Sequence, residues 1–104
     1  GLLMANDAAV DMMKGKPKDD LYALMICEGI TDFMRTCEQA RRESINLAVV
    51  AGTSGSYKNL SKTNIPKHLK IFIATDTDDS GDEYAAIICD QLPEHKLYRM
   101  PLEA

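Results

Sequence analysis

The sequence predicts an α/β fold: a compact, Rossmann-like parallel sheet of about four strands that is flanked by helices. The first observation behind this prediction is that three apolar runs, at residues 21–27, 46–51 and 70–75, do not alternate with polar residues. Such runs are typical of strands covered on both faces. The second observation is that segments with helical periodicity separate them. The third is topological: parallel strands joined by helices end at one common edge of the sheet.

The first 20 residues are predicted to be a peripheral N-terminal helix or linker, and residues 21–104 to form the domain itself. Asn6 or Asp7 can cap a short helix, which Gly15 and Pro17 would end. A chain of 104 residues is long enough for one hydrophobic core and too short for two.

The first helix inside the domain is predicted at residues 31–42, where the apolar side chains recur at helical spacing. Its predicted inward face consists of Phe33, Met34, Cys37 and Ala40. A shorter helix is expected at residues 57–68, broken before Pro66.

The last helix is predicted at residues 81–92, with Ser80 and Glu83 at the S-x-x-E spacing of a capping box. Its predicted inward-facing residues are Tyr84, Ala85, Ile88, Cys89 and Leu92. Residues 96–100 alternate more weakly and predict an edge strand.

Composition is that of an ordinary globular protein, with 45% hydrophobic and 27% charged residues. No apolar run has the length of a membrane span, and no basic segment precedes an apolar one as in a signal peptide. Cys27, Cys37 and Cys89 stand in apolar surroundings without the spacing of zinc ligands. We therefore expect reduced, buried thiols in a cytoplasmic protein with no membrane partner.

A cluster of acids follows the third apolar run, with five carboxylates between Asp76 and Glu83. Asp76 and Asp78 are close enough in sequence to share a cation, and carboxylates about 4 Å apart repel by roughly 4 kcal/mol at an effective dielectric near 20. Oxygen ligands on a short loop suit Mg²⁺ or Mn²⁺. An acidic loop that only caps the next helix is the alternative for this motif taken alone.

Two other polar elements follow predicted strands. Glu28 comes after the first strand, and Gly52-Thr53-Ser54-Gly55 after the second. The predicted topology brings both to the edge that carries Asp76 and Asp78. This convergence favours a metal site over a plain solvated loop.

Lysines gather in the middle of the chain, although the net charge is −4. No acidic residue occurs between Ser44 and Thr75. The same segment contains four lysines: Lys58, Lys62, Lys67 and Lys70. This distribution predicts that an anionic nucleic-acid backbone could lie beside the metal site. Four solubilising lysines in a loop-rich segment would give the same pattern.

The order Glu-Gly-x-x-Asp (residues 28–32), a small turn (49–53) and D-x-D-x-x-G (76–81), each after a strand, resembles the toprim domain of topoisomerases, primases and some nucleases. The resemblance covers about residues 21–100 and is nearest to primases of bacterial and phage type. It implies that Glu28 is the general acid or base or a further metal ligand. Asp32 would support the site, and Asp76 and Asp78 would hold Mg²⁺ or Mn²⁺.

Further residues at this edge are expected to contact phosphate or nucleic acid. Glycine at position 52 would let the backbone approach closely, and hydroxyl groups after it could meet phosphate. Lysines farther along could steer the backbone of a nucleic acid. These candidates are Gly52, Thr53, Ser54, Lys58 and Lys62.

By this resemblance the chain is expected to be the toprim catalytic domain of a DNA primase or primase-helicase of phage or mobile-element type. Its reaction would be metal-dependent nucleotidyl transfer during primer synthesis in DNA replication. The expected partners are template DNA, nucleoside triphosphates and the other domains of a larger parent protein, of which this chain would be a fragment. A toprim nuclease or a non-catalytic nucleic-acid-binding module would use the same residues and stays open.

Overall fold

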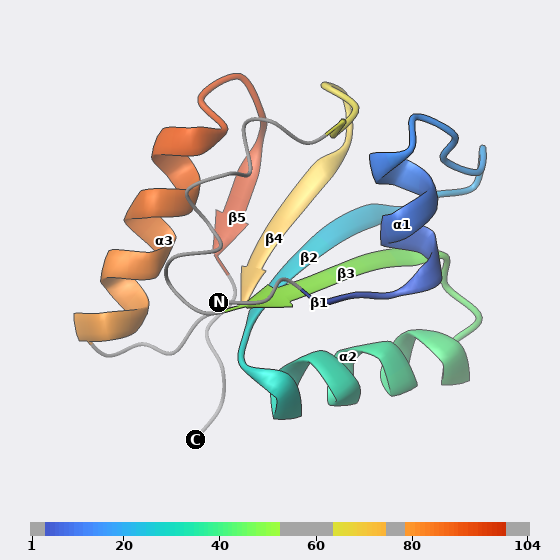
Figure 1. Cartoon of the computed structure of the whole chain (residues 1–104), viewed down its shortest axis with the longest axis horizontal. Coiled ribbons are helices and arrows are strands. Elements are labelled where there is room, and N and C mark those ends of the chain that lie inside the picture. The colour runs from blue at the N-terminus through green and yellow to red at the C-terminus, as the bar shows by residue number, and fades with distance from the viewer. Residues whose placement is uncertain (1–3, 53–63, 75–78, 100–104) are drawn as a thin grey trace.

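A five-stranded sheet forms the centre of the protein in a computed structural model that describes residues 4–52, 64–74 and 79–99 (Figure 1). The strand order is β1-β3-β2-β4-β5. The strands are β1 (Met4–Ala5), β2 (Ala23–Glu28), β3 (Leu47–Gly52), β4 (Lys70–Ala74) and β5 (Leu97–Arg99). The helices are α1 (Asp7–Met13), α2 (Ile30–Arg42) and α3 (Asp79–Gln91).

Strands β2 to β5 pair in parallel, and only the two-residue β1 runs antiparallel, against β3. The predicted α/β class, the parallel sheet and the edge position of the last strand are confirmed. The sheet has one strand more than expected, because β1 is only two residues long, shorter than the runs from which strands were predicted. The central β2 pairs with β3 on one side and β4 on the other, which explains its continuous apolar sequence.

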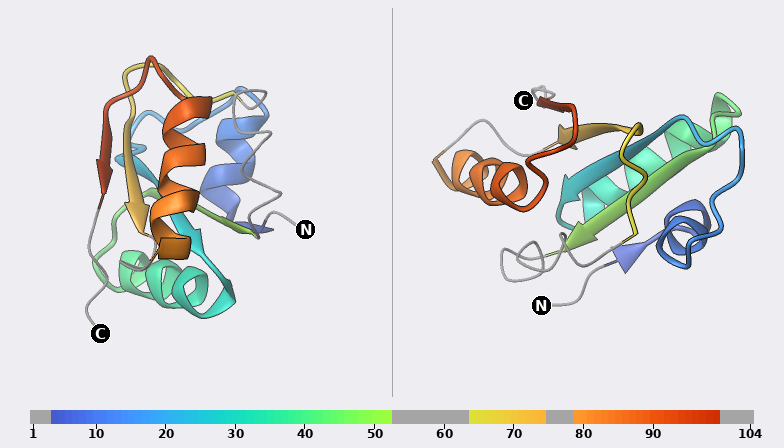
Figure 2. Two further views of the ribbon diagram at one scale, coloured as in Figure 1. Left: turned by 90° about the vertical axis from the view of Figure 1, so that its left-hand side faces the viewer. Right: turned by 90° about the horizontal axis from the view of Figure 1, so that it is seen from above.

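Helices cover both faces of the sheet (Figure 2). One face packs against α1 and α3, and its largest fully buried side chains include Met12, Leu24, Ile26, Ile71, Ile73 and Ile88. The other face packs against α2, where Phe33 and Cys37 cover Cys27, Val49 and Ala51. Successive strand residues therefore enter opposite cores, which is the physical reason for the unbroken apolar runs.

Residues 1–20 were expected to be peripheral, but α1 belongs to the main core. Ala9 is 0% and Met12 1% exposed, and both lie in the cluster that contains Ile26 and Ile73. The predicted cap is confirmed: the side chain of Asn6 accepts a hydrogen bond from the Ala9 amide at 3.0 Å. The same oxygen accepts from the Val49 amide at 3.0 Å, and the side-chain amide donates to the Leu47 carbonyl at 2.8 Å. The side chain of Asn6 therefore caps α1 and hydrogen-bonds it to the backbone of β3.

Replacing Asn6 by alanine should lower the free energy of unfolding by about 1–3 kcal/mol, because a cap is lost and backbone groups of β3 lose their partners. Urea unfolding followed by circular dichroism measures this change. Asn46→Ala is the matched control, since Asn46 makes one exposed hydrogen bond, at 2.8 Å, to Asp20. If both variants lose the same stability, the bridging role of Asn6 is wrong.

Two inward-facing assignments on the helices are wrong. Met34 is 64% exposed, on the outer side of α2, and Cys89 is exposed on α3. Both residues flank an apolar stripe whose buried members, such as Ala40 and Ile88, were predicted correctly. Helical period alone does not fix the width of the buried stripe.

Helix boundaries also differ from the expectation. Helix α3 begins at Asp79, so Ser80 lies inside its first turn and is not the cap of a capping box. Most of the helix expected at residues 57–68 lies outside the described residues, and the described part, from residue 64 on, is not helical. No helix of the described residues is long and apolar enough to cross a membrane.

Candidate metal site at the carboxyl edge of the sheet

The carboxyl ends of the three central strands lie side by side. Glu28, the last residue of β2, is in register with Gly52, the last residue of β3. Ala74, the last residue of β4, is in register with Cys27. The chain therefore leaves β4 next to Glu28, and residues 76 and 78 follow two and four positions later. Figure 1 shows the arrowheads of β3 and β4 ending close to the point where β2 turns into α2.

Glu28 is half-buried, and the turn after it depends on a glycine. Gly29, the residue before α2, has φ 90° and ψ 167°, a backbone conformation that is essentially restricted to glycine. This turn lets α2 start at Ile30, directly after the strand. The glycine of the Glu-Gly-x-x-Asp motif therefore has a structural task that the sequence analysis did not assign.

Replacing Gly29 by alanine should cost about 1–3 kcal/mol of folding free energy, because a Cβ is strained at this φ although no neighbouring atom lies within 4 Å of it. Thermal unfolding followed by circular dichroism measures the loss. Gly15→Ala, at φ 77° in the turn after α1, is a control in the less strained left-handed region and should lose less. Full stability of Gly29→Ala would contradict the strain.

Asp32 is half-buried in the first turn of α2, close to the end of β2. The Asp32 carboxylate is close enough to Cys27 to affect the pKa of its thiol. Burial raises this pKa to about 11, the hydrogen bond with Thr36 opposes the rise, and the negative charge of Asp32 adds to it. Cys27 is 0% exposed and lies in the core between the sheet and α2, where its Sγ atom is 3.5 Å from the Thr36 hydroxyl oxygen. The donors available at this edge are therefore carboxylates, which fit Mg²⁺ or Mn²⁺.

Arg99 is a charged residue at this edge that the sequence analysis missed. It ends β5, in register with Ile73 of β4, and its guanidinium pairs with the carboxylate of Asp82 in α3. This ion pair joins the end of β5 to the beginning of α3, the helix that follows the acidic segment. Arg99 and Asp82 are 17 residues apart, and no spacing rule predicts an ion pair at that separation.

The structure brings together only part of the predicted site. Glu28 and Gly52 are adjacent in the ladder, and Asp32 lies in the turn beyond them. Among the described residues no group of three or more potential ligands is placed to hold a metal ion. The remaining candidates lie outside the described residues: Thr53, Ser54, Lys58, Lys62, Asp76 and Asp78.

The other lysines of the middle segment are not beside this edge. Lys70 begins β4 and Lys67 precedes it, so both lie at the amino edge of the sheet, opposite Glu28. The expected proximity of these two lysines to the metal site is wrong, because they precede a strand whereas the acids follow one.

Comparison with protein families matches residues 25–103 to the Toprim-like family. The match covers most of the chain, and the protein belongs to this family. It starts within β2 and so includes Glu28, the D-x-D segment and Arg99. The family supports a metal-binding domain of nucleic-acid processing. Searches of curated proteins and of solved structures found no match.

Proposed function

We propose that this chain is the toprim catalytic domain of a DNA primase or primase-helicase of phage or mobile-element type. The observation that carries the proposal is the register of the central strands, in which Glu28 lies level with Gly52 and beside the strand that leads to Asp76 and Asp78. The ends of β2, β3 and β4 thereby lie at one edge, which supports a common site for the residues at and after these ends. Residues 21–104 form the toprim unit in this proposal, and α1 packs onto it.

Glu28, Asp76 and Asp78 are the residues proposed to hold Mg²⁺ or Mn²⁺. A divalent cation there would neutralise phosphate charge during nucleotidyl transfer. The Glu28 carboxylate, half-buried at the end of β2, would take or return a proton at the reacting hydroxyl group. Asp32, in the first turn of the next helix, would support the site.

The substrate side of the proposal rests on the segment after β3. Gly52 is buried at the end of that strand, level with Glu28, so a ligand bound by residue 53 or 54 would lie next to the catalytic carboxylate. Phosphate contacts are proposed for Gly52, Thr53 and Ser54, and backbone contacts with DNA for Lys58 and Lys62. The partners would be a DNA template, nucleoside triphosphates and other domains of the parent protein.

Incubating the parent protein with single-stranded DNA, labelled nucleoside triphosphates and Mg²⁺ or Mn²⁺ tests this function. A primase incorporates the labelled nucleotides into short oligonucleotides, and this incorporation requires both the template and the metal ion. Cleavage of the DNA without incorporation would favour a toprim nuclease. Binding without either reaction would favour a non-catalytic module, and both results would overturn the primase proposal.

A further inference from the structure

Lysines gather at the amino edge of the sheet, which is the edge opposite Glu28. Three connecting segments meet there: residues 14–22 before β2, 64–70 before β4, and 92–96 before β5. Their register is fixed, because Ala23 pairs with Lys70 and Ile71 with Leu97. We call the six lysines of these segments the lysine edge: Lys14, Lys16, Lys18, Lys67, Lys70 and Lys96.

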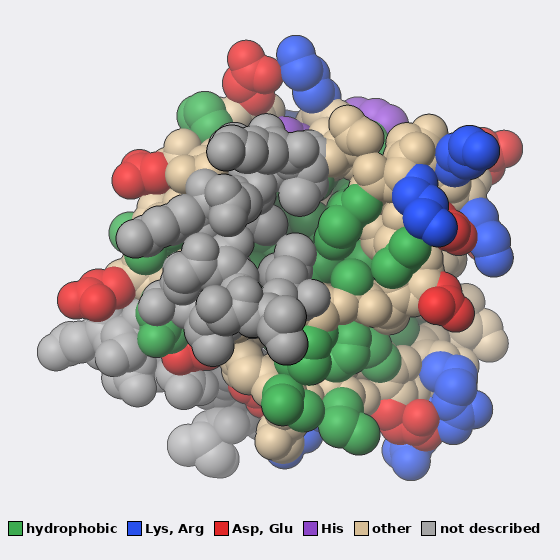
Figure 3. Space-filling view, in the orientation of Figure 1, with side chains coloured by type: hydrophobic (Ala, Val, Ile, Leu, Met, Phe, Trp, Pro, Cys, Tyr) green, Lys and Arg blue, Asp and Glu red, His purple; other side chains and the backbone are tan. Residues whose placement is uncertain are grey.

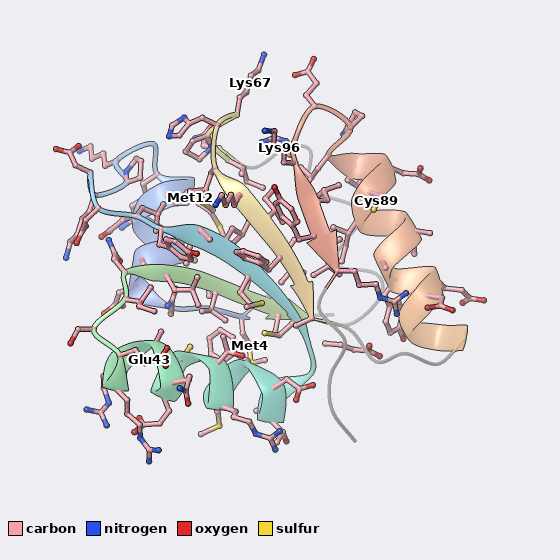
Figure 4. All side chains as sticks on the ribbon, turned by 180° about the vertical axis from the view of Figure 1, so that it is seen from behind. Met4, Met12, Glu43, Lys67, Cys89 and Lys96 are labelled. Atoms are coloured by element: carbon pink, nitrogen blue, oxygen red, sulfur yellow. The ribbon has the colours of Figure 1, made fainter. Side chains whose placement is uncertain are left out.

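All six lysines are exposed, and the segments that carry them are tied to one another. Asn64 donates a hydrogen bond to the Met13 carbonyl at 2.9 Å, and the Ile71 amide donates to the Lys96 carbonyl at 3.2 Å. Figure 4 shows Lys67 and Lys96 at the same end of the molecule, beside the starts of β4 and β5. The lysine edge is therefore one surface and not a set of unrelated loops.

The surface between these lysines is hollowed. One depression of about 180 Å³ has Lys18, Asp19 and His68 in its lining, and another of about 360 Å³ has Lys70 beside Asp19 and Asp20. Each depression therefore carries a lysine at its margin together with acidic side chains. Figure 3 shows blue lysine and arginine side chains along the upper and right margins of the molecule, interspersed with a few red acids.

The charge of this surface is opposite to that of the whole protein. The three segments contain six lysines and three acids, Asp19, Asp20 and Glu94, so they carry +3, whereas the chain carries −4. Of these six lysines, only Lys67 has an ionic partner within the described residues, Glu94 at 3.3 Å. That pair is highly exposed on both sides and holds Lys67 weakly. The other five cations have no carboxylate partner among the described residues and can meet an external anion.

We propose that the lysine edge is a second contact surface for nucleic acid, which binds the phosphate backbone away from the reacting site. Strand β4 runs from Lys70 to Ala74, a rise of about 13 Å at 3.3 Å per residue. Successive phosphates of one duplex strand are about 3.4 Å apart along the axis, so the two edges are separated by about four base pairs. Nucleic acid that reaches the carboxyl edge can therefore contact the lysine edge with its flanking part.

A nucleic acid fits this surface better than an acidic protein does, for two reasons. The lysines are spread over the segments that precede three neighbouring strands, β2, β4 and β5, so the positive charge extends along the edge of the sheet, as the charge of a phosphate backbone does. The family, moreover, is one of nucleic-acid processing. The inference depends on that class only, and not on primase activity.

The test measures binding of a fluorescein-labelled duplex to the 104-residue chain by anisotropy, in EDTA and over a series of salt concentrations. The variant Lys18→Gln/Lys70→Gln should bind about tenfold more weakly at low salt, and the slope of log affinity against log salt should fall by about two. Arg35→Gln is the control, because it removes a positive charge from an exposed position in the middle of α2. It should retain the wild-type slope.

An equal loss of affinity per removed charge in the lysine variant and in Arg35→Gln, or no loss in either, would overturn the proposal. A polyglutamate competitor that displaces the duplex more effectively than unlabelled duplex does would overturn it in favour of an acidic protein partner. Because binding is measured in EDTA, the proposed metal site takes no part in the measurement. A failure of the proposed metal site therefore leaves this result unchanged.

Discussion

Replacing Glu28 by glutamine should reduce the metal-dependent reaction rate of the parent protein by about 10²–10⁴-fold, the range that general acid–base groups contribute. Glutamine keeps the size of the side chain and its place at the end of β2 but cannot exchange a proton and is a weaker ligand for a divalent cation. Because Gly52 is level with Glu28 on β3, the substituted amide still fits beside the sheet. Steady-state rates over a range of Mg²⁺ and Mn²⁺ concentrations measure the effect.

Glu43→Gln is the matched control for this substitution. Glu43 is exposed at the far end of α2, close to the amino edge of the sheet, and it should retain the wild-type rate. Unchanged circular dichroism and melting temperature in Glu28→Gln would exclude unfolding as the cause of its loss. A Glu28→Gln rate equal to that of Glu43→Gln would mean that Glu28 is not catalytic.

Replacing Ile26 by alanine should lower the free energy of unfolding by about 2–5 kcal/mol. Ile26 is 0% exposed in the central strand and pairs with Val50 on β3 and Ile73 on β4, so the cavity left behind is closed on all sides. For a domain of this size each kcal/mol shifts the melting temperature by about 4–8 °C. Urea and thermal unfolding measure the two quantities independently.

Ile30→Ala removes the same atoms from a residue that is 62% exposed, and it should change stability by about 0.5 kcal/mol or less. The two isoleucines are four residues apart, on opposite sides of the Glu28-Gly29 turn. Similar losses in both variants would contradict the assignment of Ile26 to the core between α1, α3 and the sheet.

The strands were predictable because both faces of a parallel sheet are buried. A strand that is buried on both faces needs apolar residues at every position, so it appears in the sequence as a continuous apolar run. The three main runs correspond to β2, β3 and β4. The position of Glu28 at a strand end followed from the same pattern. The pairing of Glu28 with Gly52 is then a consequence of parallel topology, which sequence order alone implies.

Contacts between distant side chains were not predictable. The burial of α1 depends on the three hydrogen bonds of Asn6, two of which reach residues more than 40 positions away. The pair between Arg99 and Asp82 has no signal in either segment. Met34 and Cys89 lie at the margins of the apolar faces of their helices, where helical periodicity does not predict whether a side chain is buried.

The lysines of the middle segment show why charge along the sequence differs from charge in space. Lys67 and Lys70 are close in sequence to the D-x-D motif, yet β4 lies between them and that motif. In space they lie near residues 15–18, which are remote in sequence: Lys67 lines a depression with Gly15 and Pro17, and Lys18 lines another with Pro66 and His68. The sequence shows that Lys67 and Lys70 belong to a basic segment, but not that they lie at the amino edge of the sheet.

The central claim is that Glu28, Asp76 and Asp78 gather around one divalent ion where the parallel strands end. Titration of the chain with Mn²⁺, followed by electron paramagnetic resonance of the free ion, tests it most directly. We predict saturable uptake of one ion that Mg²⁺ displaces, weakened about tenfold or more in Glu28→Gln and lost in Asp76→Asn/Asp78→Asn. Uptake that none of these substitutions changes, or no saturable uptake at all, would contradict the claim.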